Sequence, residues 1–148
     1  MKIQKIKKFL KENKFRIYLK DSTTSTMDEA KILSKEIKEN FIILSKEQTQ
    51  GKGRLGKKWI SPVGNIYCSF VISNIHKDFS KICMLTCIAI KKSLEYIGVK
   101  NVTFKWPNDI YIKNKKISGI LQELFIDNFK TNRLIIGVGI NIFISPKL

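Results

Sequence analysis

The chain has 148 residues, 28 of them lysine or arginine and 12 aspartate or glutamate, so its formal net charge at pH 7 is +16. With 43% hydrophobic residues it can bury one core but not two, and we expect a single domain over residues 1–148. No apolar run reaches the roughly 20 residues that cross a membrane, and the N-terminal MKIQKIKKFL lacks the apolar stretch of a secretory signal, so we expect a cytoplasmic protein and no membrane partner.

Hydrophobic periodicity predicts a mixture of helices and strands along the chain. Helices are expected at residues 2–11, 26–38 and 79–97, and strands at 16–19, 41–45, 65–73, 102–105, 110–113, 117–125 and 133–141. In the longest helix, the residues expected to face inward are Ile82, Leu85, Ala89 and Leu94. Asn114-Lys115 is expected to form a hairpin turn. By itself this pattern supports only an α+β fold.

Residues 21–30 carry five consecutive hydroxyl side chains into the start of the second predicted helix. Ser25 with Asp28, or the pair one residue further on, has the spacing of a capping box. Helix capping accounts for at most two of the hydroxyls. Ser22 and Thr23 precede the cap, and we expect them to be free to bond a ligand.

Residues 47–59, EQTQGKGRLGKKW, combine four cationic side chains with three glycines. The glycines match G-x-G-x-x-G, but a dinucleotide site needs a helix after the last glycine, and Pro62 and Gly64 preclude one. The same stretch matches G-x-x-x-x-G-K, yet a P-loop needs Ser or Thr where this chain has Lys58. We therefore expect a mobile basic loop that closes over an anion.

Residues 104–123 place polar side chains between apolar strands. Lys105, Asp109 and Lys116 lie among apolar neighbours, and partly buried charges need partners. A ligand that carries phosphate or carboxylate would supply them.

Neither a metal site nor a specific nucleic-acid site is expected. The spacing of Cys68, Cys83 and Cys87 does not match C-x-x-C. Cys83 and Cys87 are expected to be buried thiols on a helix. The single histidine makes a transition-metal site improbable. The basic charge is mostly lysine spread along the chain, and only 20 residues precede Asp21, too few for a helix-turn-helix domain.

In their order and spacing, these segments resemble the catalytic domain of the biotin protein ligase family. The resemblance rests on Asp21-Ser22-Thr23, on Q-x-x-G-K-G-R-x-G-K-K-W-x-S-P at 48–62, on K-W-P-N-D at 105–109, on K-x-x-G-I-L at 116–121 and on G-V-G-I-N at 137–141. It implies an enzyme that activates biotin with ATP to biotinyl-5'-AMP and transfers it to a lysine of a biotin carboxyl carrier protein domain, as in acetyl-CoA carboxylase. The implied fold is α+β: a mixed, mainly antiparallel sheet with helices mostly on one side, like the catalytic fold of class II aminoacyl-tRNA synthetases.

The resemblance also implies residue roles. Catalytic roles fall to Arg54, Lys105 and Lys116. Biotin contacts fall to Ser22, Thr23, Thr24, Gln48, Lys52, Gly53, Arg54, Lys116 and Gly119. ATP contacts fall to Arg54, Trp59, Lys105, Asn108 and Asn141. Magnesium is expected to come with ATP, with no metal site formed by the protein alone.

Three departures from the family pattern leave alternatives open. Thr24 stands where asparagine is frequent, and Lys52 stands where arginine is frequent. The chain stops at Leu148, where most members continue into a small β-barrel domain, so we expect that domain to be absent, along with any N-terminal DNA-binding domain. A truncated or inactive remnant is one alternative, and a lipoate-type ligase is another, although the arginine pair and triple glycine of lipoate ligases are missing. A homodimer is a candidate assembly.

Overall fold

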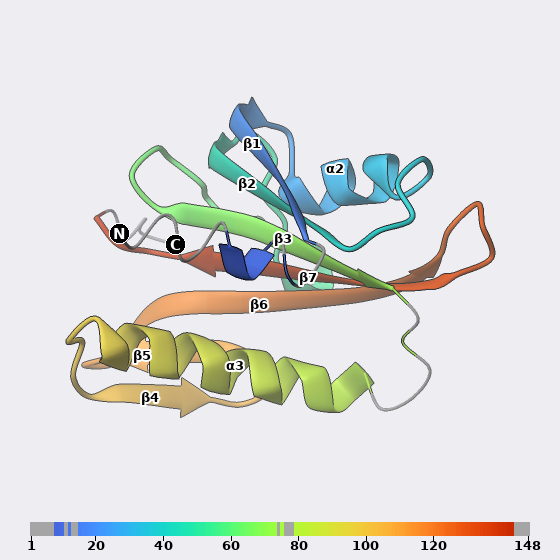
Figure 1. Ribbon diagram of the computed structural model, residues 1–148. Coiled ribbons are helices and arrows are strands. Elements are labelled where there is room, and N and C mark those ends of the chain that lie inside the picture. Colours follow the sequence, from blue (N-terminus) through green and yellow to red (C-terminus); the bar gives the residue numbers. More distant parts are fainter. Residues whose placement is uncertain (1–7, 11, 13–14, 74, 76–78, 144–148) are drawn as a thin grey trace.

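The structure, a computed structural model, describes residues 8–10, 12, 15–73, 75 and 79–143 (Figure 1). Its strands are β1 (Arg16–Thr23), β2 (Phe41–Gln48), β3 (Ile66–Ser73), β4 (Val102–Lys105), β5 (Asp109–Ile112), β6 (Lys115–Ile126) and β7 (Asn132–Ile140). Its helices are α2 (Thr26–Leu33), the short 3-10 turn η1 (Arg54–Gly56) and α3 (Phe79–Tyr96). Of the predicted helix 2–11, residues 8–10 are helical, and the rest lies outside the described residues.

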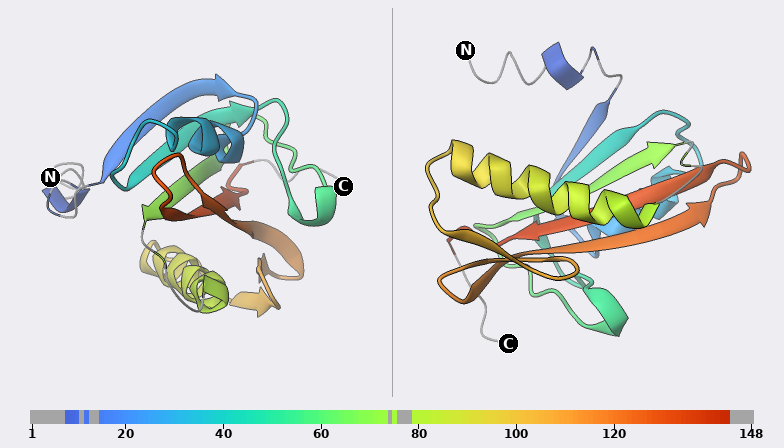
Figure 2. Two further views of the ribbon diagram at one scale, coloured as in Figure 1. Left: turned by 90° about the vertical axis from the view of Figure 1, so that its right-hand side faces the viewer. Right: turned by 90° about the horizontal axis from the view of Figure 1, so that it is seen from below.

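The strands form one sheet in the order β1-β2-β3-β7-β6-β5-β4. Only the β1–β2 pair is parallel, and each of the other neighbouring pairs is antiparallel. The predicted mixed, mainly antiparallel sheet is therefore confirmed. Two views at right angles show how strongly the sheet twists between its β1 and β4 edges (Figure 2).

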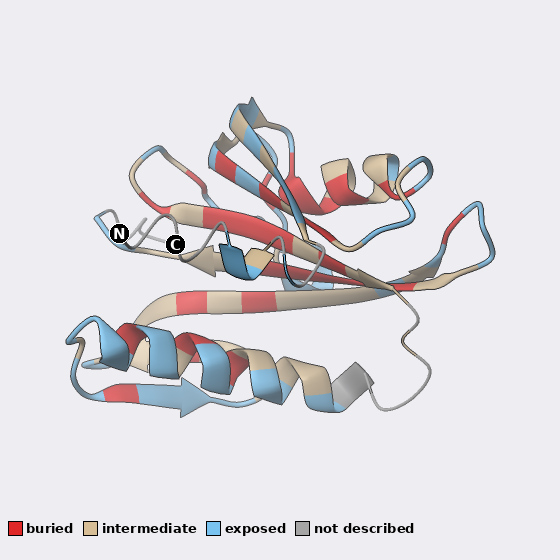
Figure 3. Ribbon diagram, in the orientation of Figure 1, coloured by how far each residue is buried: buried red, intermediate tan, exposed pale blue. Residues whose placement is uncertain are grey.

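Helices α2 and α3 pack on opposite faces of this sheet, so for these described helices the expectation that helices lie mostly on one side is wrong (Figure 1). Met27 and Ala30 of α2 pack in one apolar cluster with Ile135 of β7. The inner face of α3 packs in a second cluster with Leu134 and Ile136. Because successive side chains of a strand point to opposite faces, the continuous apolar run of β7 needs a cover on both sides. Burial is accordingly densest along β3 and β7 (Figure 3).

The prediction of α3 is correct to within one residue, but the predicted inner face is partly wrong. Leu94 is buried and Ile82 packs against the core, whereas Leu85 is 59% exposed and Ala89 is also exposed. The buried stripe runs instead through positions 87, 90 and 94, with position 83 beside it. Among the described residues, no helix is both long enough and apolar enough to cross a membrane.

Other boundaries shift where strands and turns meet. Helix α2 ends at Leu33 and not at residue 38, and the Ser34 hydroxyl donates to the Ala30 carbonyl at its end. The β5–β6 turn is formed by Lys113 and Asn114, with φ of 48° and 63°, one residue earlier than predicted. Two consecutive positive φ values are typical of a tight hairpin turn.

A buried ion pair holds the end of the sheet opposite the basic loop. The Arg133 side chain, 1% exposed, donates to Asp127 at 2.6 Å, to the Ser73 hydroxyl at 2.7 Å and to the Ile37 carbonyl at 2.6 Å. Burial acts to raise the pKa of Asp127, but hydrogen bonds from Arg133 and from two backbone N–H groups outweigh it and hold that pKa below its ordinary value. One guanidinium thus ties together the α2–β2 connection, the end of β3 and the β6–β7 turn.

We expect Asp127→Asn to lower the free energy of unfolding at pH 7 by about 3 kcal/mol, because it leaves a buried guanidinium without its counter-charge. Urea unfolding followed by circular dichroism measures the change. Asp21→Asn is the matched control, since the Asp21 carboxylate pairs with Lys46 but is 89% exposed, and it should leave the midpoint unchanged.

The difference between wild type and Asp127→Asn should also depend on pH. The pKa of Asp127 is lowered in the folded protein, so its stabilisation is fully present above the pKa of the unfolded carboxyl, about 3.9. It is lost as pH falls through the lower folded pKa. A difference in stability that stays constant down to pH 2 would contradict this account.

Candidate functional site

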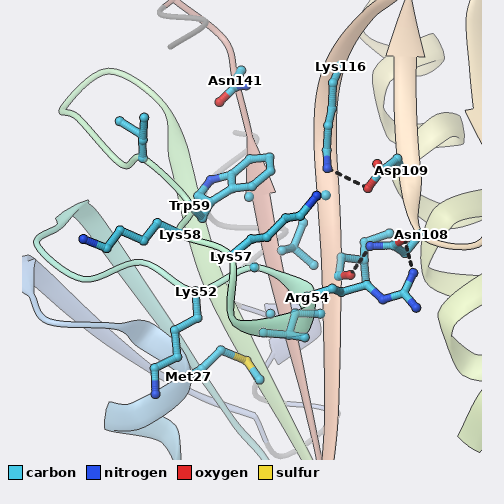
Figure 4. A pocket seen from close by; sticks show the side chains of 18 of the residues that line it. Met27, Lys52, Arg54, Lys57, Lys58, Trp59, Asn108, Asp109, Lys116 and Asn141 are labelled. Carbon is cyan, nitrogen blue, oxygen red and sulfur yellow. Dashed lines mark hydrogen bonds and ion pairs between the residues drawn. The ribbon is translucent and has the colours of Figure 1, made fainter. Parts of the chain in front are cut away.

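A cavity of about 790 Å³ opens beside the first turn of α2 (Figure 4). Its walls come from the start of α2, the basic loop after β2, and the segment from β4 to β6. Its floor is formed by β6 and β7. Segments that lie far apart in the sequence therefore meet at one place on the sheet.

The floor is flat because glycines stand in register on the two strands. Gly119 pairs with Gly139, and the Trp59 ring lies over both. A Cβ added to Gly139 would lie 2.4 Å from the indole nitrogen, and one added to Gly119 would lie 2.8 Å from the six-membered ring. These distances leave no room for any side chain, so the indole rests directly on the backbone.

A third glycine, Gly137, lets α2 approach the sheet closely in the same way. A Cβ at Gly137 would lie 2.6 Å from the sulfur of Met27, a side chain that is only 3% exposed. The first turn of α2 therefore sits as close to β7 as the tryptophan does. This places Thr26 and Met27 in the cavity wall.

The basic loop forms a narrow hairpin. A bridge joins Lys52 to Lys58, the Trp59 N–H donates to the Gly51 carbonyl at 2.8 Å, and η1 forms the tip. No α-helix follows the last loop glycine before β3, which confirms that neither phosphate-binding motif applies. Leu55 at the tip is 92% exposed with φ of 55°, so the loop projects from the sheet.

Positive charge converges on this cavity. Its described lining contains one acid, Asp109, and seven basic side chains, those of Lys52, Arg54, Lys57, Lys58, Lys105, Lys115 and Lys116. Such an excess of cations favours a ligand with several negative charges.

Three of the cations rest on polar neighbours. Lys52 lies 2.6 Å from Asp28 of α2, and Arg54 donates to the Asn108 side chain at 2.8 Å. Lys116 lies 2.8 Å from Asp109, without the alignment of a hydrogen bond, and 5.2 Å from the centre of the Trp59 ring (Figure 4). These contacts hold the cations near the cavity and remain exchangeable, because the side chains are partly exposed.

The neutral end of the cavity differs from the sequence prediction. Ser25 occupies the N-cap of α2, but its side chain makes no capping bond, so the predicted capping box is wrong. Gln48 at the end of β2 caps the helix instead, because its Oε1 accepts from the Thr26 N–H at 2.8 Å and from the Thr26 hydroxyl at 3.1 Å. The Ser25 hydroxyl is buried without a partner among the described residues.

Most of the predicted site residues line the cavity. They are Gln48, Lys52, Gly53, Arg54, Trp59, Lys105, Asn108, Lys116, Gly119 and Asn141. Ser22, Thr23 and Thr24 do not line it, because β1 continues to Thr23 and pairs there with the end of β2. Their contact with biotin stays a prediction.

Thr26 and Met27 line the cavity and were missed by the sequence analysis. The sequence contains Ser-Thr twice, at 22–23 and at 25–26, and only the second pair adjoins the helix. The start of the helix was the signal that could have found them. Gly137 and Gly139 belong to a quoted motif, but their steric role needed the strand register.

Burial disfavours the thiolate form of the three cysteines. Burial raises the pKa of Cys68 to about 12 and is the main cause that raises the pKa of Cys87 to about 11. The pKa of Cys83 is also raised by burial, and its thiol, which is only partly buried, donates to the Pro107 carbonyl at 3.7 Å.

The mainly antiparallel sheet and the basic cavity on it are features that this chain shares with a known protein family. Residues 18–141 match the model of the biotin/lipoate A/B protein ligase family, and the chain belongs to that family. It is 35% identical over 109 residues to the bifunctional ligase/repressor BirA of Escherichia coli, which covers 72% of this chain and 34% of the relative.

Two further comparisons agree. The biotin--[acetyl-CoA-carboxylase] ligase of Paracoccus denitrificans is 27% identical over 129 residues, covering 84% of this chain and 53% of the relative. The biotin protein ligase of Aquifex aeolicus, solved with biotin and ATP, superposes with a TM-score of 0.76 at 30% identity, covering 89% of this chain and 55% of that one. The chain thus spans between a third and somewhat more than half of these relatives.

We expect Gly139→Ala to destabilise the fold by about 2 kcal/mol, since the added methyl overpacks against the indole. Trp59→Ala removes the ring that the methyl would strike, so the double variant should be more stable than the sum of the two single effects predicts. Urea unfolding of the four proteins measures this coupling. Strictly additive effects would show that the ring does not rest on Gly139.

Proposed function

We propose that this chain activates biotin with ATP and transfers the biotinyl group to a lysine of a biotin carboxyl carrier protein domain. The observation that carries the proposal is the polarity of one cavity. One wall offers the neutral hydrogen-bonding groups of Thr26 and Gln48, and seven cations line the rest of the cavity, with Lys52 beside α2. The ureido ring of biotin both donates and accepts hydrogen bonds, whereas its carboxylate and the ATP phosphates are anions.

The first step joins two anions. A carboxylate oxygen of biotin attacks the α-phosphorus of ATP, the new O–P bond forms, and the bond to pyrophosphate breaks. Arg54 and Lys116 would offset the repulsion, Arg54 through a planar fork that can hold carboxylate and phosphate together. At about 4 Å and an effective dielectric of about 20, one cation is worth roughly 4 kcal/mol to an anion before desolvation.

The second step transfers the acyl group. A neutral lysine amine of the carrier attacks the acyl carbon of biotinyl-5'-AMP and forms the C–N bond, AMP leaves with the electron pair of the broken C–O bond, and the amine nitrogen gives up one proton. The loop over residues 51–58 would exclude water while the carrier docks. Asn108, Trp59, Lys105 and Asn141 are the proposed contacts of the nucleotide.

Arrival of the ligand would exchange one set of contacts for another. Lys52, Arg54 and Lys116 rest on Asp28, Asn108 and Asp109. A carboxylate or phosphate competes with these neighbours for the same cations. The cations would therefore move over short distances and need not be gathered from solvent.

Magnesium would be held by ATP, because the residues present do not suit a protein-held ion. Within the described ranges, no group of three histidine, cysteine, aspartate or glutamate side chains could hold a metal. Asp109, the only acid in the described lining, is paired with Lys116. Magnesium bound by the phosphates would neutralise part of their charge.

We propose the cytoplasm as the compartment. The proposed reaction uses ATP, and the three cysteines are free thiols. The carrier lysine must reach the cavity mouth, and the loop tip at Leu55, which lies there, is exposed. Dimerisation stays a prediction.

The direct test incubates the purified chain with ATP, magnesium and radiolabelled biotin, with and without a biotin carrier domain. We expect biotinyl-5'-AMP in both reactions and labelled carrier in the second. Labelled lipoate in place of biotin serves as the specificity control. Formation of neither product by folded protein would favour an inactive remnant, and activation of lipoate alone would identify the lipoate-type alternative.

We expect Arg54→Gly to release biotinyl-5'-AMP roughly tenfold faster, equivalent to about 1.4 kcal/mol. The freed adenylate would label lysines of an unrelated protein that the wild type leaves unlabelled. Arg16→Gly is the matched control, because Arg16 pairs with Glu39 and does not line the cavity. Unchanged carrier selectivity in Arg54→Gly would count against this role of Arg54.

A further inference from the structure

Ser61 connects the neutral end of the cavity to the basic loop, although it is not among the residues that line the cavity. It is 4% exposed and lies just after the loop, bridged to Gln48 at the end of β2. Its hydroxyl accepts from Gln48 Nε2 at 2.8 Å and donates to the Trp59 carbonyl at 2.8 Å. One buried hydroxyl therefore contacts both a wall residue and the loop residue that rests on the glycine floor.

The backbone of α2 fixes which way the Gln48 amide faces. The Thr26 N–H can only donate, so the Gln48 atom opposite it must be the oxygen. The nitrogen of the amide is thereby turned toward Ser61. Rotating the amide by half a turn would set one donor against another at Thr26.

The hydroxyl protons of this network are all committed. Ser69, fully buried on β3, donates to the Thr26 hydroxyl at 2.9 Å, and that hydroxyl donates to Gln48 Oε1. The Ser61 proton goes to the Trp59 carbonyl, an acceptor that cannot reverse the direction. One N–H of the Gln48 amide is left unused among the described residues, so this side chain offers the cavity a donor and no acceptor.

The backbone of Gly51 packs tightly against Ser61 and its two partners. A Cβ added to Gly51 would lie 2.3 Å from the Trp59 carbonyl oxygen, 2.5 Å from Ser61 Oγ and 2.9 Å from Gln48 Nε2. Removing the hydroxyl would leave the Gln48 amide N–H and the Trp59 carbonyl without this hydrogen-bond partner, which costs free energy in a buried site.

We propose that Ser61 is a positioning residue for ligand recognition, which aligns the Gln48 amide as a donor at the neutral end of the cavity. The inference deepens the proposed function, because it assumes that the biotin head group occupies the end formed by Thr26 and Gln48. It requires the ligand to present an acceptor to Gln48, as the ureido carbonyl of biotin does.

Ser61→Ala tests the proposal through the separation of two Michaelis constants. We expect the KM for biotin to rise about tenfold, the usual scale for a buried partner left unpaired. The KM for ATP and kcat should stay within about twofold of wild type, since the cationic end is untouched.

Ser45→Ala is the matched control. Ser45 is also buried on β2, at 2% exposure, and its hydroxyl bonds only to the Glu47 carbonyl, outside the network. Both Michaelis constants should match wild type. A folded Ser61→Ala with an unchanged KM for biotin, or with the two constants raised together, would overturn the proposal.

Ser69→Ala provides a second test that does not depend on the stability of Ser61→Ala. It removes the donor to Thr26 from the opposite end of the network, so the KM for biotin should again rise with that for ATP unchanged. An unchanged KM for biotin in this variant would also overturn the proposal. A wild type that forms no biotinyl-5'-AMP would instead refute the proposed function.

Discussion

The site depends on the absence of side chains at one place on the sheet. Gly119 and Gly139 face each other across β6 and β7, and the Trp59 ring occupies the space that their side chains would fill. Because side chains alternate between faces, a slip of one residue in either strand would put Ile120 or Val138 in that place. The strand register and the seating of the loop are therefore one constraint, and the cavity walls follow from it.

A second property of the site is that part of its positive charge is paired within the protein. Seven cations around one cavity repel each other, and Asp28 and Asp109 offset part of that repulsion from within the protein. Both acids are only partly buried, so their pairs are weak enough to exchange. The resulting site combines a preformed neutral end with an adaptable cationic end.

Sequence reasoning was most successful where a pattern was long or local. The apolar periodicity of α3 predicted its boundaries to within one residue, and the boundaries of β4 were predicted equally well. The glycine and lysine content of residues 51–58 identified the loop. The inner face of α3 was predicted only in part, because Leu85 and Cys87 are both apolar and only the shape of the sheet decides between them. Periodicity limits the buried face of a helix to a stripe of apolar residues, and packing against the sheet decides which of them are buried.

The roles that escaped prediction involve partners distant in sequence. Gln48 was expected to contact ligand, and nothing near it in the sequence indicated that it caps a helix 22 residues earlier. The choice between two Ser-Thr pairs likewise required the end of β1. Local windows contain the residue types of the site but not the contacts that orient them.

The remote cap of α2 has a consequence for how the protein folds. With eight residues, α2 is shorter than the about 12–15 residues at which isolated helices become stable in water. Its first turn depends on Gln48, which is in place only when β2 has joined the sheet. A nascent chain that has emerged only as far as α2 does not yet contain Gln48, the residue that caps this helix. The neutral wall of the cavity should form late and cooperatively with the sheet, so partly folded chains would not hold a working site.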